Sequence, residues 1–281
     1  MKERASFTAA WVAGCRSLGA VLPEHARLAD DPYGARFAPP PMSSLLYTPR
    51  LARVALRRFI VYMQVRTRVL DDVLLDFARG GGRQIVLLGA GFDCRALRFA
   101  EPLSQATVFE IDHPATQAKK REVLRDDVGA RTEYVAWDFE HRDMRDLPAA
   151  LAGHGHDEKR PTLTIWEGVT MYLTKEAIDA SVRAVAEYSA PRSPLALTYF
   201  DRTSVSRPSV RQRVVRRVVA SVGEPFRFGW SPRELPGWFR ARGFEVIRDD
   251  DVVDIAKGLL PQRFALPADR VSRHIAVVRK I

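Results

Sequence analysis

Short runs of apolar residues alternate along the chain with segments in which apolar positions recur every three or four residues. The apolar runs predict strands at residues 84–88, 106–112, 132–137, 162–167, 194–200, 244–249 and 273–279. The periodic segments predict helices that begin near residues 93, 114, 142, 174, 207 and 231. This alternation is typical of a doubly wound, Rossmann-like α/β fold, so we expect a seven-stranded, mostly parallel sheet with helices on both faces.

The first 80 residues precede this alternation and have helical spacing. Residues 6–30 predict one amphipathic helix. Thr48-Pro49 is typical of an N-cap followed by proline in the first turn, and it predicts a second helix that continues after a bend. We therefore expect residues 1–80 to form an N-terminal helical cap on a core at residues 81–281, within a single domain.

The last third of the chain departs from regular alternation. Residues 202–230 form an insertion that we expect to be a helical lid, and Ser231-Pro232-Arg233-Glu234 after it predicts a capping box. The last two strands have no clear long helix between them, and their connection contains Gly258 and two prolines. The last strand is therefore predicted to be antiparallel, at or near the sheet edge.

Composition narrows the class of protein. The 281 residues carry a formal net charge of +10, and the basic patches at residues 50–68 and 207–217 have helical spacing with apolar residues between the charges. We interpret them as solvated helix faces; an anionic substrate would also fit, whereas no recognisable motif supports a nucleic-acid partner. No apolar run could span a bilayer, so we expect a cytoplasmic protein without a membrane partner. Cys15 and Cys94 are expected to be free thiols.

The most informative stretch is the apolar run that enters Gly89-Ala90-Gly91. A strand that ends in Gly-x-Gly lets a ligand approach the backbone. A dinucleotide-binding turn would have a third glycine where Cys94 stands, and Asp93 would repel a diphosphate but could face an α-ammonium group. The turn therefore favours S-adenosyl-L-methionine over a nicotinamide nucleotide, with a purely structural turn as the remaining alternative.

Three later strands end in acidic or aromatic residues. Glu110 and Asp112 end the second strand about twenty residues after the turn, which is the spacing expected of an acid that reaches a ribose diol. Asp138 and Phe139 follow the third strand, where they could bind and stack on adenine, although a loop acid is the alternative. Glu167 follows the fourth, where the methionine part and the methyl acceptor would meet; its alternative is a salt bridge.

Two further side chains are candidates for the site. Arg66 lies on the apolar stripe of the second helix, where it could hold a ligand carboxylate as a bidentate fork or form a structural salt bridge. Tyr172 is a candidate catalytic residue, as a wall or hydrogen-bond donor for the acceptor, or else a core tyrosine. His154 and His156 lack nearby cysteines, so no metal site is expected, and His113 is interpreted as a helix-entry residue.

Four blocks of sequence, in this order, resemble the leucine carboxyl methyltransferase-like class I methyltransferases, which include bacterial polyketide O-methyltransferases. The blocks are residues 65–72, 84–95, 109–114 and 166–174. The resemblance implies that Arg66 binds the cofactor carboxylate and that Glu167 lies near the methionine amine. It also implies that the backbone of Gly89 and Gly91 lies against the cofactor, that Asp112 binds the ribose, and that Asp138 and Phe139 contact the adenine. Arg16 aligns more weakly with a basic residue that contacts the cofactor, and Cys94 stands where threonine is common.

We therefore expect an enzyme that transfers a methyl group from S-adenosyl-L-methionine to an oxygen of a small, anionic metabolite, polyketide-like or another natural product. A carboxylate acceptor is favoured because its pKa of about 4 leaves it ionised at neutral pH, whereas a phenol, with a pKa of about 10, would need a general base. Phenol or hydroxyl methylation, protein carboxyl methylation, an NAD-dependent oxidoreductase and a nucleic-acid-binding protein are the alternatives.

Overall fold

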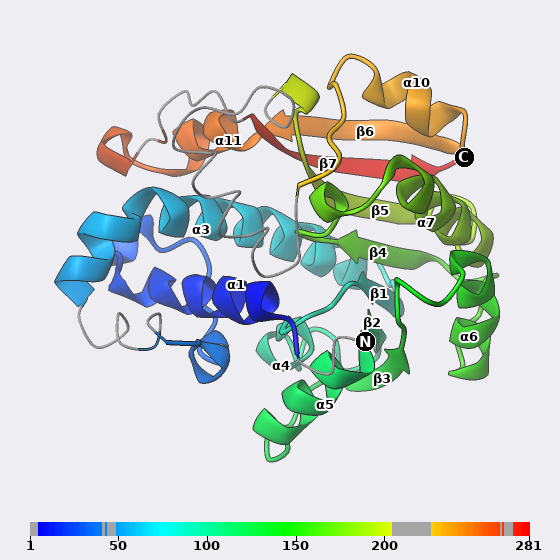
Figure 1. The fold of residues 1–281 in the computed structure, drawn as a ribbon, viewed down its shortest axis with the longest axis horizontal. Coiled ribbons are helices and arrows are strands. Elements are labelled where there is room, and N and C mark those ends of the chain that lie inside the picture. Colours follow the sequence, from blue (N-terminus) through cyan, green and yellow to red (C-terminus); the bar gives the residue numbers. More distant parts are fainter. Residues whose placement is uncertain (1–4, 41–42, 44–48, 204–225, 265, 267–271) are drawn as a thin grey trace.

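The computed structural model describes residues 5–40, 43, 49–203, 226–264, 266 and 272–281, and it contains the expected seven-stranded sheet (Figure 1). The strands are β1 (Gln84–Leu88), β2 (Thr107–Asp112), β3 (Arg131–Ala136), β4 (Thr162–Trp166), β5 (Pro194–Phe200), β6 (Phe244–Asp251) and β7 (Arg273–Lys280). Their order is β3-β2-β1-β4-β5-β7-β6, and β7 is antiparallel to both of its neighbours while the pairs from β3 to β5 are parallel. The predicted antiparallel last strand is confirmed, one position inside the edge strand β6.

Helices cover both faces of the sheet because alternate strand residues point to opposite sides. Ile85 and Leu87 of β1 pack in a core with helices α3 (Pro49–Arg79) and α11 (Val252–Leu259), and α1 (Phe7–Ser17) lies along α3 (Figure 1). Val86 and Leu88 pack in a second core with α6 (Leu147–Gly153), α7 (Lys175–Tyr188) and α10 (Leu235–Arg240). The doubly wound fold is therefore confirmed.

Several helix boundaries differ from the prediction. The first helix ends at Ser17 and is followed by short 3₁₀ helices at Leu18–Val21 and Glu24–Ala26. Pro23, between these two, is incompatible with one α-helix running through to residue 30. The second helix, α3, is continuous over 31 residues, so the expected bend does not interrupt it. The helix expected near residue 93 is the single turn α4 (Arg95–Arg98).

The helix caps agree with the sequence in two places and disagree in one. His113 caps α5 (Pro114–Val123) by accepting a hydrogen bond from Ala115 N, and Thr174 caps α7 in the same way. The capping box predicted at Ser231 is wrong, because α10 begins four residues later with proline in its first turn. The carboxylate of Glu234 instead accepts a hydrogen bond from Arg202.

Some predictions fall on residues that the structure does not describe. Thr48, the predicted N-cap of α3, lies outside the described residues, as do residues 204–225 of the predicted lid and the helix expected near residue 207. Among the helices that are described, none is long and apolar enough to cross a membrane.

Candidate active site

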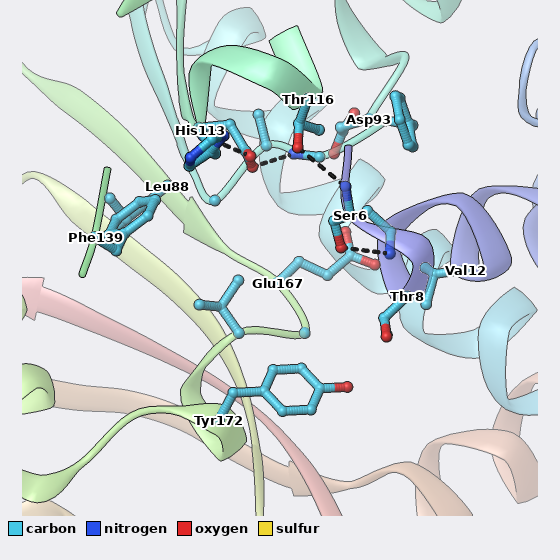
Figure 2. A pocket seen from close by; sticks show the side chains of 18 of the residues that line it. Ser6, Thr8, Val12, Leu88, Asp93, His113, Thr116, Phe139, Glu167 and Tyr172 are labelled. Carbon is cyan, nitrogen blue, oxygen red and sulfur yellow. Dashed lines mark hydrogen bonds between the residues drawn. The ribbon is translucent and has the colours of Figure 1, made fainter. Parts of the chain in front are cut away.

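The carboxyl ends of the parallel strands open on one cavity of about 1340 Å³, which α1 and α3 border on one side (Figure 2). Nine of the ten residues predicted from the sequence line it, and only Glu110 does not. The nine are Arg66, Gly89, Gly91, Asp93, Asp112, Asp138, Phe139, Glu167 and Tyr172. They come from five separate segments, and the fold therefore brings the predicted site residues to one place.

The glycine turn joins the tips of β1 and β2. The N–H groups of Gly89 and Ala90 both donate to the carbonyl of Ile111, at 2.9 and 3.0 Å. Gly89 and Gly91 have φ angles of +73° and +53°, which side-chain-bearing residues rarely adopt. A Cβ on Gly89 would lie 2.6 Å from Cγ2 of Val169, so the absence of a side chain lets the segment after β4 approach the turn.

Asp112 ends β2 and fixes the turn from the other side. One carboxylate oxygen accepts a hydrogen bond from Gly91 N at 2.6 Å, and the other accepts from His113 N at 2.7 Å. Burial raises the pKa of Asp112, although these two backbone N–H groups favour its ionised form. The side chain lines the cavity beside the glycine turn, where an acid that recognises a ribose would be expected.

Arg66 and Glu167 form a buried pair at the cavity wall. Nε of Arg66 donates to Oε1 of Glu167 at 2.7 Å, and only 4% of Arg66 is exposed. Both interpretations of Arg66 are therefore compatible with the geometry, because the arginine has a protein partner and also lines the cavity. Gly168 has a φ of +72°, whereas a Cβ there would lie 3.5 Å from Nη1 of Arg66, an ordinary contact distance, so backbone conformation and not crowding favours glycine here.

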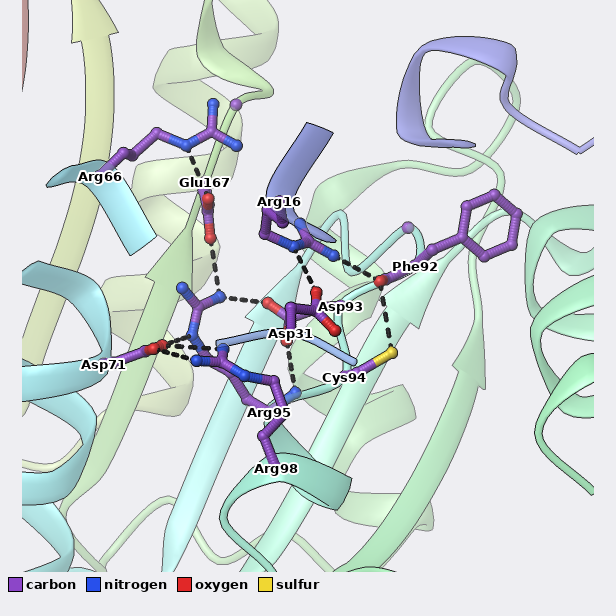
Figure 3. Close-up of polar contacts among 12 residues, drawn as sticks. Arg16, Asp31, Arg66, Asp71, Phe92, Asp93, Cys94, Arg95, Arg98 and Glu167 are labelled. Atoms are coloured by element: carbon purple, nitrogen blue, oxygen red, sulfur yellow. Dashed lines mark hydrogen bonds and ion pairs between the residues drawn. The ribbon is translucent and has the colours of Figure 1, made fainter. Parts of the chain in front are cut away.

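This pair belongs to a larger buried network (Figure 3). Four arginines and four acids are linked by ion pairs, so their formal charges cancel: Arg16 with Asp31, Arg66 and Arg95 with Glu167, Arg95 with Asp71 and Asp93, and Arg98 with Asp71. Burial alone would raise the pKa of Glu167, but Arg95 and Arg66 hold it well below its usual range. Asp93 is shifted in the same direction, since Arg95 and Arg16 outweigh its burial.

Glu110 lies outside the cavity. Its carboxylate accepts a hydrogen bond from Nζ of Lys120 on α5 at 2.6 Å, and both side chains are buried. Lys120 also donates to the backbone carbonyl of Asp93. Glu110 therefore supports the glycine turn from beneath, through Lys120, and its position does not support the direct cofactor contact expected from the sequence.

Asp138 and Phe139 lie at the opposite end of the cavity from α3. Asp138 accepts a hydrogen bond from Glu140 N, and its second oxygen lies 2.9 Å from Nδ1 of His141. Slight burial would raise the pKa of Asp138, but these contacts lower it, so the carboxylate remains ionised. Figure 2 shows the ring of Phe139 at the cavity wall near Leu88, a position from which it could stack on a flat base.

Tyr172 lies on a short 3₁₀ turn after β4 and lines the same cavity as Phe139. Its ring packs against Phe226 at a centroid distance of 5.5 Å, and its hydroxyl is directed toward Thr8 and Val12 of α1 (Figure 2). Met171 beside it accepts a hydrogen bond from Arg227 N at 2.7 Å, so the chain that returns from the insertion is tied to this turn. Arg227 also lines the cavity.

The site also contains residues that sequence reasoning did not single out. Arg16, only weakly aligned by resemblance, lines the cavity and donates to the carbonyl of Phe92 at 2.6 Å. The roles of Asp31, Asp71 and Arg95 had no signal in spacing, because their partners are distant in sequence. Within the part of the chain that the structure describes, no group of three potential metal ligands is found.

Comparison with known proteins agrees with this geometry. A protein of Streptomyces coelicolor, named as a candidate S-adenosyl-L-methionine-dependent methyltransferase, is 36% identical over 183 residues, which are 65% of this chain and 62% of that protein. A protein of Mycobacteroides abscessus with the same kind of name is 31% identical over 259 residues, 85% of this chain and 82% of that one.

The fold has solved counterparts. The crystal structure of a duf574 family protein from Streptomyces avermitilis superposes with a TM-score of 0.61 at 18% identity, covering 95% of this chain and 97% of that one. The family model for leucine carboxyl methyltransferases matches residues 9–186, which include most of α1, the glycine turn, Asp112 and Glu167. The chain belongs to the leucine carboxyl methyltransferase family.

Proposed function

We propose that this chain is an S-adenosyl-L-methionine-dependent O-methyltransferase whose acceptor is a small anionic metabolite, with a carboxylate oxygen favoured. One observation carries the proposal: a single large cavity unites a glycine turn, an acid at the next strand tip and a buried arginine–glutamate pair. The chain spans 62% of the length of the first relative named above. Membership of the family supports methyl transfer as the proposed activity, but it does not identify the methyl acceptor.

The cavity fits the cofactor in shape and in charge. Its volume of about 1340 Å³ exceeds that of a usual small-molecule site, roughly 300–1,000 Å³, and leaves room for a cofactor and an acceptor together. Gly89 and Gly91 provide a cradle without side chains. Asp112 would bind the ribose hydroxyls, Asp138 and Phe139 the adenine, and Arg66 the amino-acid carboxylate.

When bound, S-adenosyl-L-methionine supplies a methyl group on a sulfonium. The protein binds and orients both reactants and excludes water, and such alignment can contribute on the order of 7–11 kcal/mol. Glu167 stays ionised at neutral pH because its guanidinium neighbours hold its pKa low, so it can face an α-ammonium group. No residue of the chain has to form a covalent bond in this proposal.

A positively charged side chain at the end of the cavity near Tyr172 supports an anionic acceptor. Four cations that line the cavity already have acidic partners: Arg16, Arg36, Arg66 and Lys119. Arg227 lines the cavity and pairs with none of the acids that the structure describes. Its guanidinium is therefore the best candidate to hold an anionic group of the acceptor beside the ring of Tyr172.

The choice of a carboxylate over a phenol rests on His113, which lines the cavity. Its Nδ1 accepts a hydrogen bond from Ala115 N, so the neutral ring carries its proton on Nε2. In that tautomer the exposed nitrogen cannot take a proton from a phenol. A carboxylate needs no such base because it is already ionised.

The test combines cofactor binding with methyl transfer. Calorimetry should show binding of S-adenosyl-L-methionine that is lost in Arg66→Ala and Asp112→Ala and retained in Arg68→Ala, because Arg68 pairs with Asp72 at the surface. Methyl transfer from labelled cofactor should give base-labile esters of small organic acids. The proposal fails if wild-type protein does not bind the cofactor or takes up NADH instead, and label found only on protein substrates would favour a protein carboxyl methyltransferase.

A further inference from the structure

Arg95 is the most completely buried arginine beside the cavity, with only 1% of its surface exposed. It begins α4 immediately after the glycine turn and is not among the residues that line the cavity. Its guanidinium therefore interacts with other protein groups and not with solvent. Neither the sequence motifs nor the proposed cofactor contacts assign it a role.

The contacts of Arg95 link three parts of the fold (Figure 3). Nε donates to Oδ1 of Asp71 on α3 at 2.8 Å, and Nη1 donates to Oε2 of Glu167 after β4 at 2.7 Å. Nη1 also donates to the carboxylate of Asp93 in the turn, and the backbone N–H of Arg95 donates to the other oxygen of that carboxylate at 2.8 Å. One planar guanidinium thus fixes three carboxylates at once.

Two of these three carboxylates, Asp93 and Glu167, line the cavity. Glu167 is held between Arg66, which binds Oε1 and lines the cavity, and Arg95, which binds Oε2 from the buried side. Two acids this close repel each other, so a shared cation between them is needed to keep both ionised.

We propose that Arg95 is a positioning residue that aims Asp93 and Glu167 at the amino-acid end of the cofactor without touching the cofactor itself. This inference rests on the proposed function, since it assigns these carboxylates to the methionine part of S-adenosyl-L-methionine. It predicts a selective effect: loss of Arg95 weakens recognition of the amino-acid end and spares recognition of the adenosine end.

Two ligands separate these ends. S-adenosylhomocysteine carries the amino-acid group, and 5′-methylthioadenosine lacks it. Calorimetry on Arg95→Met should show S-adenosylhomocysteine binding weakened by about tenfold or more, while 5′-methylthioadenosine changes by less than about twofold. Arg98→Met is the control, because Arg98 is a neighbouring arginine whose side chain is only 7% exposed and which pairs with Asp71 but not with Asp93 or Glu167. It should leave both affinities unchanged.

A pH series gives a readout that a purely structural role would not move. Glu167 faces Arg95 from α4, Arg66 from α3, Arg16 from α1 and Asp93 from the turn. Without Arg95, its pKa should rise, so S-adenosylhomocysteine affinity of Arg95→Met should fall as the pH is lowered from about 7 to about 5 while wild-type affinity stays level.

Each outcome has one meaning. Arg95→Lys retains the charge but not the planar fork, so a selective loss of S-adenosylhomocysteine affinity in it supports the inference even if Arg95→Met does not fold. Equal loss of both ligands, no loss of either, or failure of both variants to fold assigns Arg95 a structural role and overturns the inference. If the wild type binds neither ligand, the proposed function itself fails.

Discussion

Replacing Gly89 by alanine tests how closely the glycine turn approaches the segment after β4. At a φ of +73°, alanine costs about 1–2 kcal/mol in backbone strain. Its Cβ would lie 2.6 Å from Cγ2 of Val169, and crowding of this kind adds about 1–3 kcal/mol, because a β-branched side chain has few rotamers into which it can move. Gly89→Ala should therefore lower the free energy of unfolding by about 2–5 kcal/mol.

A control glycine separates strain from crowding. Gly81 has a φ of +88°, yet a Cβ there would have no neighbour within 4 Å, so Gly81→Ala should cost only the strain of about 1–2 kcal/mol. Adding Val169→Ala to Gly89→Ala should recover the crowding part, as a favourable coupling of about 1–3 kcal/mol in a double-mutant cycle.

The assay is equilibrium unfolding in urea followed by tryptophan fluorescence, with S-adenosylhomocysteine affinity measured in parallel. Gly81→Ala should bind the ligand normally, whereas Gly89→Ala should not, since Gly89 lines the cavity. Equal destabilisation by Gly89→Ala and Gly81→Ala, or no recovery on adding Val169→Ala, would refute the close approach that we infer.

Three further predictions concern buried charges. Lys120→Met should lower the free energy of unfolding in urea by about 3–5 kcal/mol, because it leaves Glu110 buried without its cation, whereas Lys119→Met at the surface should cost less than about 0.5 kcal/mol; similar costs would contradict this. The lowered pKa of Glu167 means that its contribution to stability is present above its unfolded-state pKa of about 4.3 and is lost as the pH falls through its folded-state pKa. The stability difference between wild type and Glu167→Gln should thus stay level from about pH 7 to about pH 5 and shrink as the pH falls below about 4.3, and a difference that stays constant down to about pH 3 would argue against the shift. Asp112→Asn should weaken S-adenosylhomocysteine binding by about tenfold in calorimetry, and unchanged affinity would remove Asp112 from the ribose site.

The fold and the cavity lining were largely predictable because each rests on a local pattern. β1 is a run of five buried residues that ends in glycine, and burial on both faces leaves little choice but a central parallel strand. Because neighbouring parallel strands point the same way, the residues that follow their carboxyl ends lie at the same edge of the sheet. This is why Asp112, Asp138 and Glu167 could be placed together from the sequence alone.

The ion-pair network could not be predicted, because its partners are far apart in the chain. Arg66 and Glu167 are separated by 101 positions and Arg95 and Glu167 by 72, so no periodicity relates them. Glu110 was placed with Asp112 because both carboxylates come near the end of the second strand, but only Asp112 stands at its last position. Lys120 could have shown that Glu110 has a structural partner, since a lysine on the buried side of a helix needs an acid to pair with.

The balanced set of four arginines and four acids also bears on how members of this family can diverge. Loss of any one member unbalances buried charges, so we expect the half of the cavity that this set supports to tolerate few substitutions. Among the described residues, Arg227 at the other end of the cavity belongs to no such set of ion pairs. If the proposed function holds, we expect acceptor preference in this family to change by substitution there, while the half proposed to bind the methyl donor stays the same.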